Sequence, residues 1–158
     1  EGVWALGDAS NTFQLKHVAN AEAKAVAHNV LHPDDLKEYP HDVVPAGIFT
    51  HPQIATVGLT EEEARNRCDT VTVKVQKYGD VAFGWAMEDT TGLVKVIGDS
   101  STGKLLGAHL IGPQATTLIQ TFITGLVWDI GYKELAHNQY WIHPALPEVV
   151  ENALLGLD

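Results

Sequence analysis

Alternating apolar and polar residues mark the middle of the chain as a series of β-strands. Val71, Val73 and Val75 alternate with polar residues, which is the period of a half-buried strand. Sequences rich in Gly, Ser, Thr and Asp, which favour turns, lie between further short apolar runs. These runs predict strands at 48–50, 55–57, 81–87, 94–97 and 105–111. Because the connections are short, we expect an antiparallel meander.

Helical periodicity appears on both sides of the predicted strands. Residues 15–31 are rich in alanine, and Ala19, Ala23 and Ala27 lie four apart along the chain. That spacing places them on one helical face, where small side chains let another backbone approach closely. Shorter helices are predicted at 61–67, at 132–137 and from about 148 onward.

The segment 115–130 predicts a longer helix with one wide apolar stripe. Its members are Leu118, Ile119, Phe122, Ile123, Leu126, Val127 and Ile130. Such a stripe is wider than packing on one sheet requires, and an excess of apolar surface often marks an interface. We therefore expect a homodimer; the alternative is that the sheet covers the whole stripe.

Two structural parts are expected along the chain. The short apolar run at 3–6 is typical of a strand in an α/β unit. Residues 33–45 hold three of the seven prolines, with acidic residues between them, and predict a linker. We therefore expect residues 1–42 to be a remnant of an α/β domain. Residues 43–158 should form an α+β domain, with four or five antiparallel strands and helices packed on one face.

Composition narrows the class of protein. The 158 residues are 45% hydrophobic and 19% charged, which is typical of a globular protein. Ten Lys and Arg against 20 Asp and Glu give a net charge of −10, which disfavours nucleic acid and anionic membranes as partners. The chain has no apolar run close to the ~20 residues of a membrane-spanning helix. It lacks an initial Met and a secretory leader, so we expect a piece of a longer protein.

Cysteine and histidine positions bear on redox and metal chemistry. Cys68 is the only cysteine, which excludes an internal disulfide and a Cys-x-x-Cys centre and favours a reducing cytoplasm. Among the eight histidines, only His28 and His32 have helical ligand spacing, and Pro33 adjoins the second. No carboxylates are placed to complete a site, so no metal is expected.

His143 and Glu148 form the most informative polar pair. Pro144 keeps His143 out of the α region, and Pro147 suits the start of a helix whose first turn contains Glu148. A carboxylate there can reach back to the imidazole. Such a contact fixes the tautomer and leaves the other ring nitrogen for proton transfer. The alternative is a helix cap without catalytic function.

Four motifs, in order along the chain, carry a resemblance to a known family. They are Val3-Trp-Ala-Leu-Gly-Asp-Ala9, the segment from Thr50-His-Pro to Glu62, Gly107-Ala-His-Leu-Ile-Gly112 and His143-Pro-Ala-Leu-Pro-Glu148. The chain resembles the C-terminal third of the flavoprotein disulfide reductases, also called pyridine nucleotide-disulfide oxidoreductases. Residues 140–157 are most similar to the mycothione reductases of that family. The N-terminal flavin fingerprint, the redox Cys-x4-Cys and the nicotinamide domain have no counterpart in the chain.

The resemblance implies a reaction and a domain assignment. Residues 1–42 would belong to an FAD domain and 43–158 to a dimerisation domain, with both His-Pro bonds cis. Electrons would pass from NADPH through FAD and a redox disulfide to a small-molecule disulfide, here mycothione. His143 would protonate the leaving thiolate and Glu148 would orient His143. In the family this histidine acts on the disulfide of the other subunit, so the homodimer would be required.

The same resemblance assigns the flavin contacts. Gly7 and Asp8 end the second flavin motif, where Asp8 would bind the ribityl chain, although a simple turn is the alternative. Backbone amides of Leu15, Lys16 and His17 would face the flavin pyrimidine. FAD and NADPH would be cofactors of the longer protein, and we expect neither to bind this chain alone. Two alternatives remain: a dihydrolipoamide dehydrogenase-like enzyme, and a dimerisation module without activity of its own.

Overall fold

The structure is a computed structural model that describes residues 2–157. The chain folds into two compact units, Glu1–Val44 and Pro45–Asp158. The division falls two residues after the boundary expected from the sequence. The outermost residues of the expected domains, Glu1 and Asp158, lie outside the described part.

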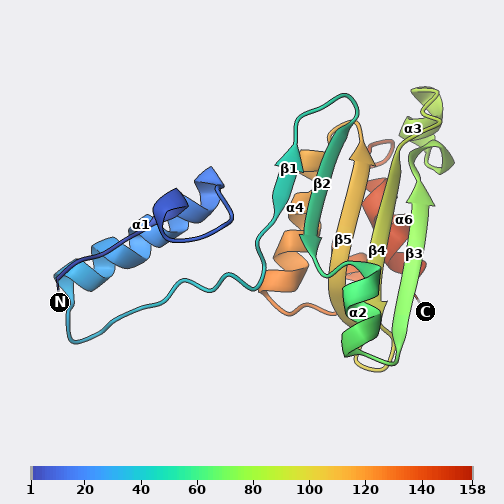
Figure 1. Cartoon of the computed structure of the whole chain (residues 1–158). Helices are drawn as coiled ribbons and strands as arrows, with labels where there is room; N and C mark the ends of the chain where they lie inside the picture. Colours follow the sequence, from blue (N-terminus) through green and yellow to red (C-terminus); the bar gives the residue numbers. More distant parts are fainter. Residues whose placement is uncertain (1, 158) are drawn as a thin grey trace. The chain divides into compact units, whose positions relative to one another are not determined.

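The first unit is a helix with a short turn packed against it (Figure 1). It contains the 3-10 turn η1 (Gly7–Ala9) and the helix α1 (Lys16–Leu31), which ends where predicted and begins one residue later. The strand expected at 3–6 is absent from this part of the described chain, where these residues belong to no helix or strand. A strand needs a neighbour to complete its hydrogen bonds, and none of the described residues of this unit supplies one.

The buried face of α1 differs from the one expected. Its buried residues are Val18, Glu22 and Asn29. Of the three alanines, only Ala19 lies against another backbone. A Cβ atom added to Gly7 would lie 3.3 Å from the Cβ of Ala19. Ala23 and Ala27 are exposed. The expected close approach is therefore limited to Ala19, because the neighbouring turn spans only the first half of the helix.

The second unit is built on an antiparallel sheet, as predicted. Within residues 45–157 its strands lie in the order β1-β2-β5-β4-β3. They are β1 (Ala46–Ile48), β2 (Gln53–Gly58), β3 (Val71–Lys77), β4 (Leu93–Asp99) and β5 (Lys104–Gly112). Strands β3, β4 and β5 form a meander, but β2 pairs with β5 instead of β3. The simple meander expected for all strands is therefore wrong.

The chain reaches the far edge of the sheet by crossing it after β2. This crossing carries α2 (Glu61–Arg67), which Figure 1 shows in front of the sheet. The Leu59 amide donates to the Leu106 carbonyl over 2.9 Å. A Cβ on Gly107 would lie only 2.0 Å from the Leu59 oxygen. The crossing therefore depends on glycine in β5.

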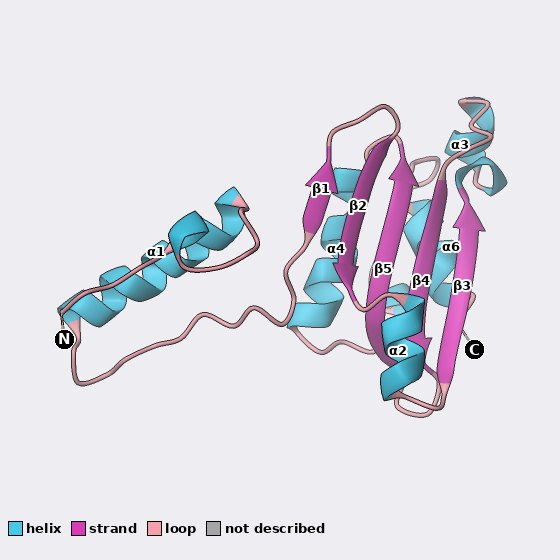
Figure 2. Ribbon diagram, in the orientation of Figure 1, coloured by secondary structure: helices cyan, strands magenta, loops and turns pink. Residues whose placement is uncertain are grey.

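Two helices cover the opposite face of the sheet (Figure 2). The helix α4 (Ala115–Val127) packs on β5 and β2, and α6 (Glu148–Leu155) packs on β3 and β4. The short helix α5 (Tyr132–His137) lies against α6. Leu118, Ile119 and Phe122 of α4 are buried against the sheet, whereas Val127 is 58% exposed. The sheet thus covers most of the stripe and leaves its C-terminal end open.

The apolar run at 81–87 is not a strand, contrary to the prediction. It forms the helix α3 (Ala82–Ala86), which follows the 3-10 turn η2 (Tyr78–Asp80). Periodicity alone does not distinguish a strand from a helix in so short a run. The helix packs so closely on the turn that a Cβ atom added to Gly84 would lie 1.9 Å from the backbone carbonyl oxygen of Tyr78.

Candidate active site

The imidazole of His143 and the carboxylate of Glu148 are in hydrogen-bonding contact. His143 Nδ1 lies 2.7 Å from Glu148 Oε1, so the carboxylate does reach back to the imidazole as the sequence predicts. The His143 side chain is 68% exposed, whereas that of Glu148 is 16% exposed. A partly buried carboxylate therefore holds one nitrogen of an imidazole that remains open to solvent. The peptide bonds before Pro52 and Pro144 are both cis, as predicted.

The start of α6 places Glu148. Pro147 caps the helix and Glu148 is its first residue. The second carboxylate oxygen, Oε2, accepts the Ala145 amide over 3.0 Å, so both oxygens have partners in the His143 segment. The hydrogen bond from His143, then that from the Ala145 amide, lowers the pKa of Glu148 below its ordinary 4.5. The carboxylate is thus ionised at neutral pH and suited to stabilise an imidazolium.

Neighbouring contacts anchor the loop that carries His143. Trp141 Nε1 donates to the Ala136 carbonyl at the end of α5 over 2.8 Å. On the other side of the histidine, Leu146 is 2% exposed and belongs to the core. Tyr140, just before the first anchor, and Ile142, between the two anchors, are exposed. The loop therefore presents His143 at the surface between two fixed points.

A groove of about 520 Å³ lies beside His143. His143 and Pro144 form one side, and residues of η2 and α3, with Val81 between them, supply the remainder. Trp85 and Phe83, both in the lining, are 76% and 39% exposed. Sequence reasoning missed this groove because it assigned 81–87 to a strand. The groove is open and mostly apolar, and the imidazole lies at its edge.

The residues expected to bind flavin lie in the first unit. Gly7 has a φ of +67°, a conformation that favours glycine, and Asp8 follows it in η1 with an exposed side chain. Leu15 is the N-cap of α1, and Lys16 and His17 are its first residues. The Leu15 side chain makes no cap, and the first-turn amides of an α-helix point outward along its axis.

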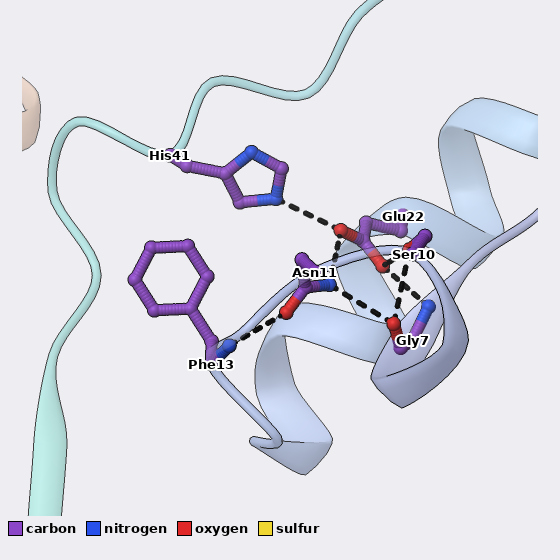
Figure 3. Close-up of polar contacts among 6 residues, drawn as sticks. All are labelled: Gly7, Ser10, Asn11, Phe13, Glu22 and His41. Carbon is purple, nitrogen blue, oxygen red and sulfur yellow. Dashed lines mark hydrogen bonds and ion pairs between the residues drawn. The ribbon is translucent and has the colours of Figure 1, made fainter.

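A carboxylate that the sequence did not single out organises this region (Figure 3). Glu22 accepts hydrogen bonds from the Gly7 amide over 2.5 Å and from Asn11 Nδ2 over 2.7 Å. It also contacts His41 Nε2 at 2.9 Å. A glutamate within a helical sequence is usually read as a surface residue. The only available signal was its spacing of four from Val18, on what proves to be the buried face.

Several histidines have partners other than a metal. His109 is held on both ring nitrogens, by Thr56 Oγ1 at 2.6 Å and the Leu59 carbonyl at 3.1 Å. His28, one of the two histidines with helical ligand spacing, contacts the Asp35 carbonyl at 2.8 Å through its Nε2. Residues 2–157 contain no group of three or more His, Cys, Asp or Glu placed to hold a metal ion. None of the helices in that range is long and apolar enough to cross a membrane.

Comparison with known proteins agrees with the fold and motifs. Residues 44–154 match the family described as pyridine nucleotide-disulphide oxidoreductase, dimerisation domain. Mycothione reductase of Mycobacterium tuberculosis is 55% identical over 160 residues, covering 99% of this chain and 35% of the relative. Dihydrolipoyl dehydrogenase of Corynebacterium glutamicum is 32% identical over 99% of this chain and 34% of the relative.

Solved structures show the same architecture. A HOCl-induced flavoprotein disulfide reductase from Escherichia coli superposes with a TM-score of 0.88 and 24% identity. The superposition covers 98% of this chain and 35% of that one. The chain therefore spans about a third of the length of the relatives it matches. From its fold, its motifs and these matches, the chain belongs to the pyridine nucleotide-disulphide oxidoreductases and carries their dimerisation domain.

Proposed function

We propose that the chain is part of an NADPH-dependent, FAD-containing disulfide reductase whose substrate is mycothione. The contact of 2.7 Å between His143 and Glu148, at the edge of an open groove, carries this proposal. It pairs an exposed imidazole with an ionised carboxylate, which is the arrangement a general acid requires. The 55% identity to a mycothione reductase supports the choice of substrate.

In this proposal His143 supplies the proton for the leaving group. A thiolate of the enzyme attacks one sulfur of the substrate disulfide, a new disulfide bond forms, and the bond between the two substrate sulfurs breaks. The departing thiolate takes the proton from Nε2 of His143. Glu148 holds the Nδ1 side of the ring, which fixes the ring orientation and stabilises the imidazolium.

The first unit fits part of a flavin site. The amides at the start of α1 can face an electron-rich ring edge, and the exposed Asp8 carboxylate can accept hydrogen bonds from hydroxyl groups. We assign Gly7, Asp8, Leu15, Lys16 and His17 to FAD on this basis. FAD, when bound, relays electrons from NADPH to the redox disulfide. These few contacts are insufficient for a dinucleotide, so we expect the isolated chain to bind neither cofactor usefully and to be inactive.

A homodimer is the proposed active form. The family description names the matched region as a dimerisation domain. Apolar side chains remain exposed at the end of α4 and in the loop before His143: Val127, Trp128, Tyr140 and Ile142. Contact with a second subunit would cover such side chains and place His143 beside the partner's redox disulfide.

A dihydrolipoamide dehydrogenase-like activity is the second candidate, supported by relatives at 32% identity. The two are separated by assaying the full-length protein with mycothione and with lipoamide, each with NADPH and NADH. We expect oxidation of NADPH with mycothione to be the fastest combination. A preference for lipoamide would establish the second candidate, and no turnover with either disulfide would contradict both.

A further inference from the structure

Glu22 is a charged residue on the buried face of α1. It lies between Val18 and Asn29 in the row of buried residues, and the residue as a whole is only 9% exposed. Burying a carboxylate is unfavourable unless hydrogen bonds replace its water. Hydrogen bonding from the Gly7 amide is the largest influence on this group and lowers the pKa of Glu22 below its ordinary value of 4.5. The carboxylate is therefore ionised where it lies.

The partners of Glu22 converge on the turn at Gly7. Its Oε2 accepts the Gly7 amide over 2.5 Å and lies 3.4 Å from Ser10 Oγ, while Oε1 accepts Asn11 Nδ2 over 2.7 Å. Ser10 and Asn11 in turn donate to the Gly7 carbonyl, from Ser10 N over 2.9 Å and from Asn11 Nδ2 over 3.1 Å. Both polar groups of Gly7 are thus fixed by one network, which Figure 3 shows.

The same carboxylate also holds the segment that follows α1. His41 Nε2 lies 2.9 Å from Glu22 Oε1, and the His41 ring stacks on Phe13 with centroids 5.4 Å apart. Phe13 itself is tied back to the turn, since its amide donates to Asn11 Oδ1 over 2.8 Å. The network therefore contacts the loop between Gly7 and the start of α1 at two places, at Gly7 and at Phe13.

We propose that Glu22 is a positioning residue for the flavin. It fixes the Gly7-Asp8 turn against α1, so that the Asp8 carboxylate and the first-turn amides of α1 keep one relative placement. This inference rests on the proposed function, because it needs FAD to bind at Gly7, Asp8 and the start of α1. Glu22 does not touch the cofactor in this assignment; it acts through the Gly7 peptide.

The chain offers a matched control on the same helix. Asn29 is 6% exposed and binds the Lys37 backbone twice, through its Nδ2 to the carbonyl at 2.9 Å and its Oδ1 to the amide at 2.7 Å. Its removal breaks a buried polar contact between α1 and the following segment. It leaves the network around Gly7 untouched. Loss of stability alone should therefore affect both variants, whereas loss of positioning should affect only Glu22.

The test uses the full-length protein, stripped of FAD and titrated with FAD while flavin fluorescence is recorded. Thermal unfolding of each apoprotein is measured in parallel. We expect Glu22→Ala to weaken FAD binding by about tenfold or more, because the Gly7 amide loses its acceptor. Glu22→Gln, which retains one acceptor oxygen, should recover part of the affinity. Asn29→Ala should bind FAD within about twofold of the unsubstituted protein even where its melting temperature falls.

Each outcome decides the proposal. Unchanged FAD affinity in Glu22→Ala overturns it, and so does an equal loss of affinity in Asn29→Ala at equal loss of stability. If Glu22→Ala does not fold, Glu22→Gln and Asn11→Ala take its place. If these two variants then bind FAD no more weakly than Asn29→Ala does, the proposal is overturned. Failure of the unsubstituted protein to bind FAD would instead contradict the proposed function together with this inference.

Discussion

Glu148 contacts both the imidazole of His143 and the backbone just before α6, the helix that Glu148 begins. One of its oxygens lies 2.7 Å from His143 Nδ1, and the other accepts the Ala145 amide over 3.0 Å. Neither oxygen can rotate away without breaking a contact, so the carboxylate fixes the direction in which the imidazole points. This arrangement distinguishes Glu148 from a simple cap, which would satisfy only the backbone of α6.

Replacing this carboxylate should change stability with a definite pH dependence. The pKa of Glu148 is lowered in the folded chain, so ionised Glu148 stabilises the fold above its ordinary pKa of 4.5. That contribution is lost as pH falls through the lower, folded pKa. Urea unfolding of the chain and of Glu148→Gln should therefore show the largest difference in free energy of unfolding near neutral pH and a smaller one below about pH 4.

Glu62 provides the control for this experiment. It lies on α2, its side chain is exposed, and that side chain forms no hydrogen bond or ion pair within the described residues. Glu62→Gln should alter the free energy of unfolding by less than about 0.5 kcal/mol at every pH. A difference for Glu148→Gln that stays constant down to pH 3 would show that the carboxylate has no special partner in the fold.

We expect Trp85 to contribute to substrate binding and not to the stability of the fold. Its side chain lines the groove beside His143 and is 76% exposed. Trp85→Ala should therefore leave the free energy of unfolding within about 0.5 kcal/mol. It should lower kcat/KM for the disulfide by about tenfold in the full-length protein, since the substrate loses an apolar contact. Val75→Ala, at a half-exposed position away from the groove, should leave kcat/KM unchanged; equal losses would contradict a binding role for the groove.

Tyr78 offers a test of the core. Its side chain is fully buried, and its hydroxyl is without a hydrogen-bond partner among the described residues. Burial raises the pKa of this hydroxyl, so the group stays neutral. Tyr78→Phe removes the unpaired oxygen and should stabilise the chain by about 1 kcal/mol. Tyr140→Phe, at an exposed position, should have no effect in the same urea titration, and a less stable Tyr78→Phe would indicate a missing partner.

The strongest local patterns predicted their elements well. The alternation at Val71, Val73 and Val75 became β3, and the stripe at 115–130 became a helix packed on the sheet. The approach of Glu148 to His143 was also predictable, because Pro144 and Pro147 constrain the backbone on both sides of the short connection. In these cases the information lies within a few residues of the feature.

Features that depend on distant segments were not predictable in the same way. The pairing of β2 with β5 joins residues about fifty apart, and the crossing that permits it needs Gly107 beneath Leu59. The run at 81–87 becomes a helix because Gly84 packs on Tyr78. Glu22 is buried only because the Gly7 turn folds onto α1. Each of these features depends on a tertiary contact that the local pattern of apolar and polar residues does not predict.

Mixed dimers test whether the site is shared between subunits. One subunit carries His143→Gln, and the other retains His143 but lacks the redox cysteines of the full-length protein. Each should be nearly inactive alone. Co-expression should restore about a quarter of the activity, because half of randomly formed dimers are mixed and each has one complete site. No recovery in verified mixed dimers would place His143 beside the disulfide of its own subunit.

The role of His143 is the central claim, and stopped-flow kinetics of His143→Gln test it most directly. Flavin absorbance follows reduction by NADPH, and thiol release follows reduction of the disulfide substrate. We expect disulfide reduction to slow by about 10²–10⁴-fold, the usual contribution of a general acid. Flavin reduction by NADPH should remain within about twofold of the unsubstituted protein, because that step requires no proton at the leaving thiolate. Equal slowing of both half-reactions, or an unchanged rate of disulfide reduction, would contradict the account.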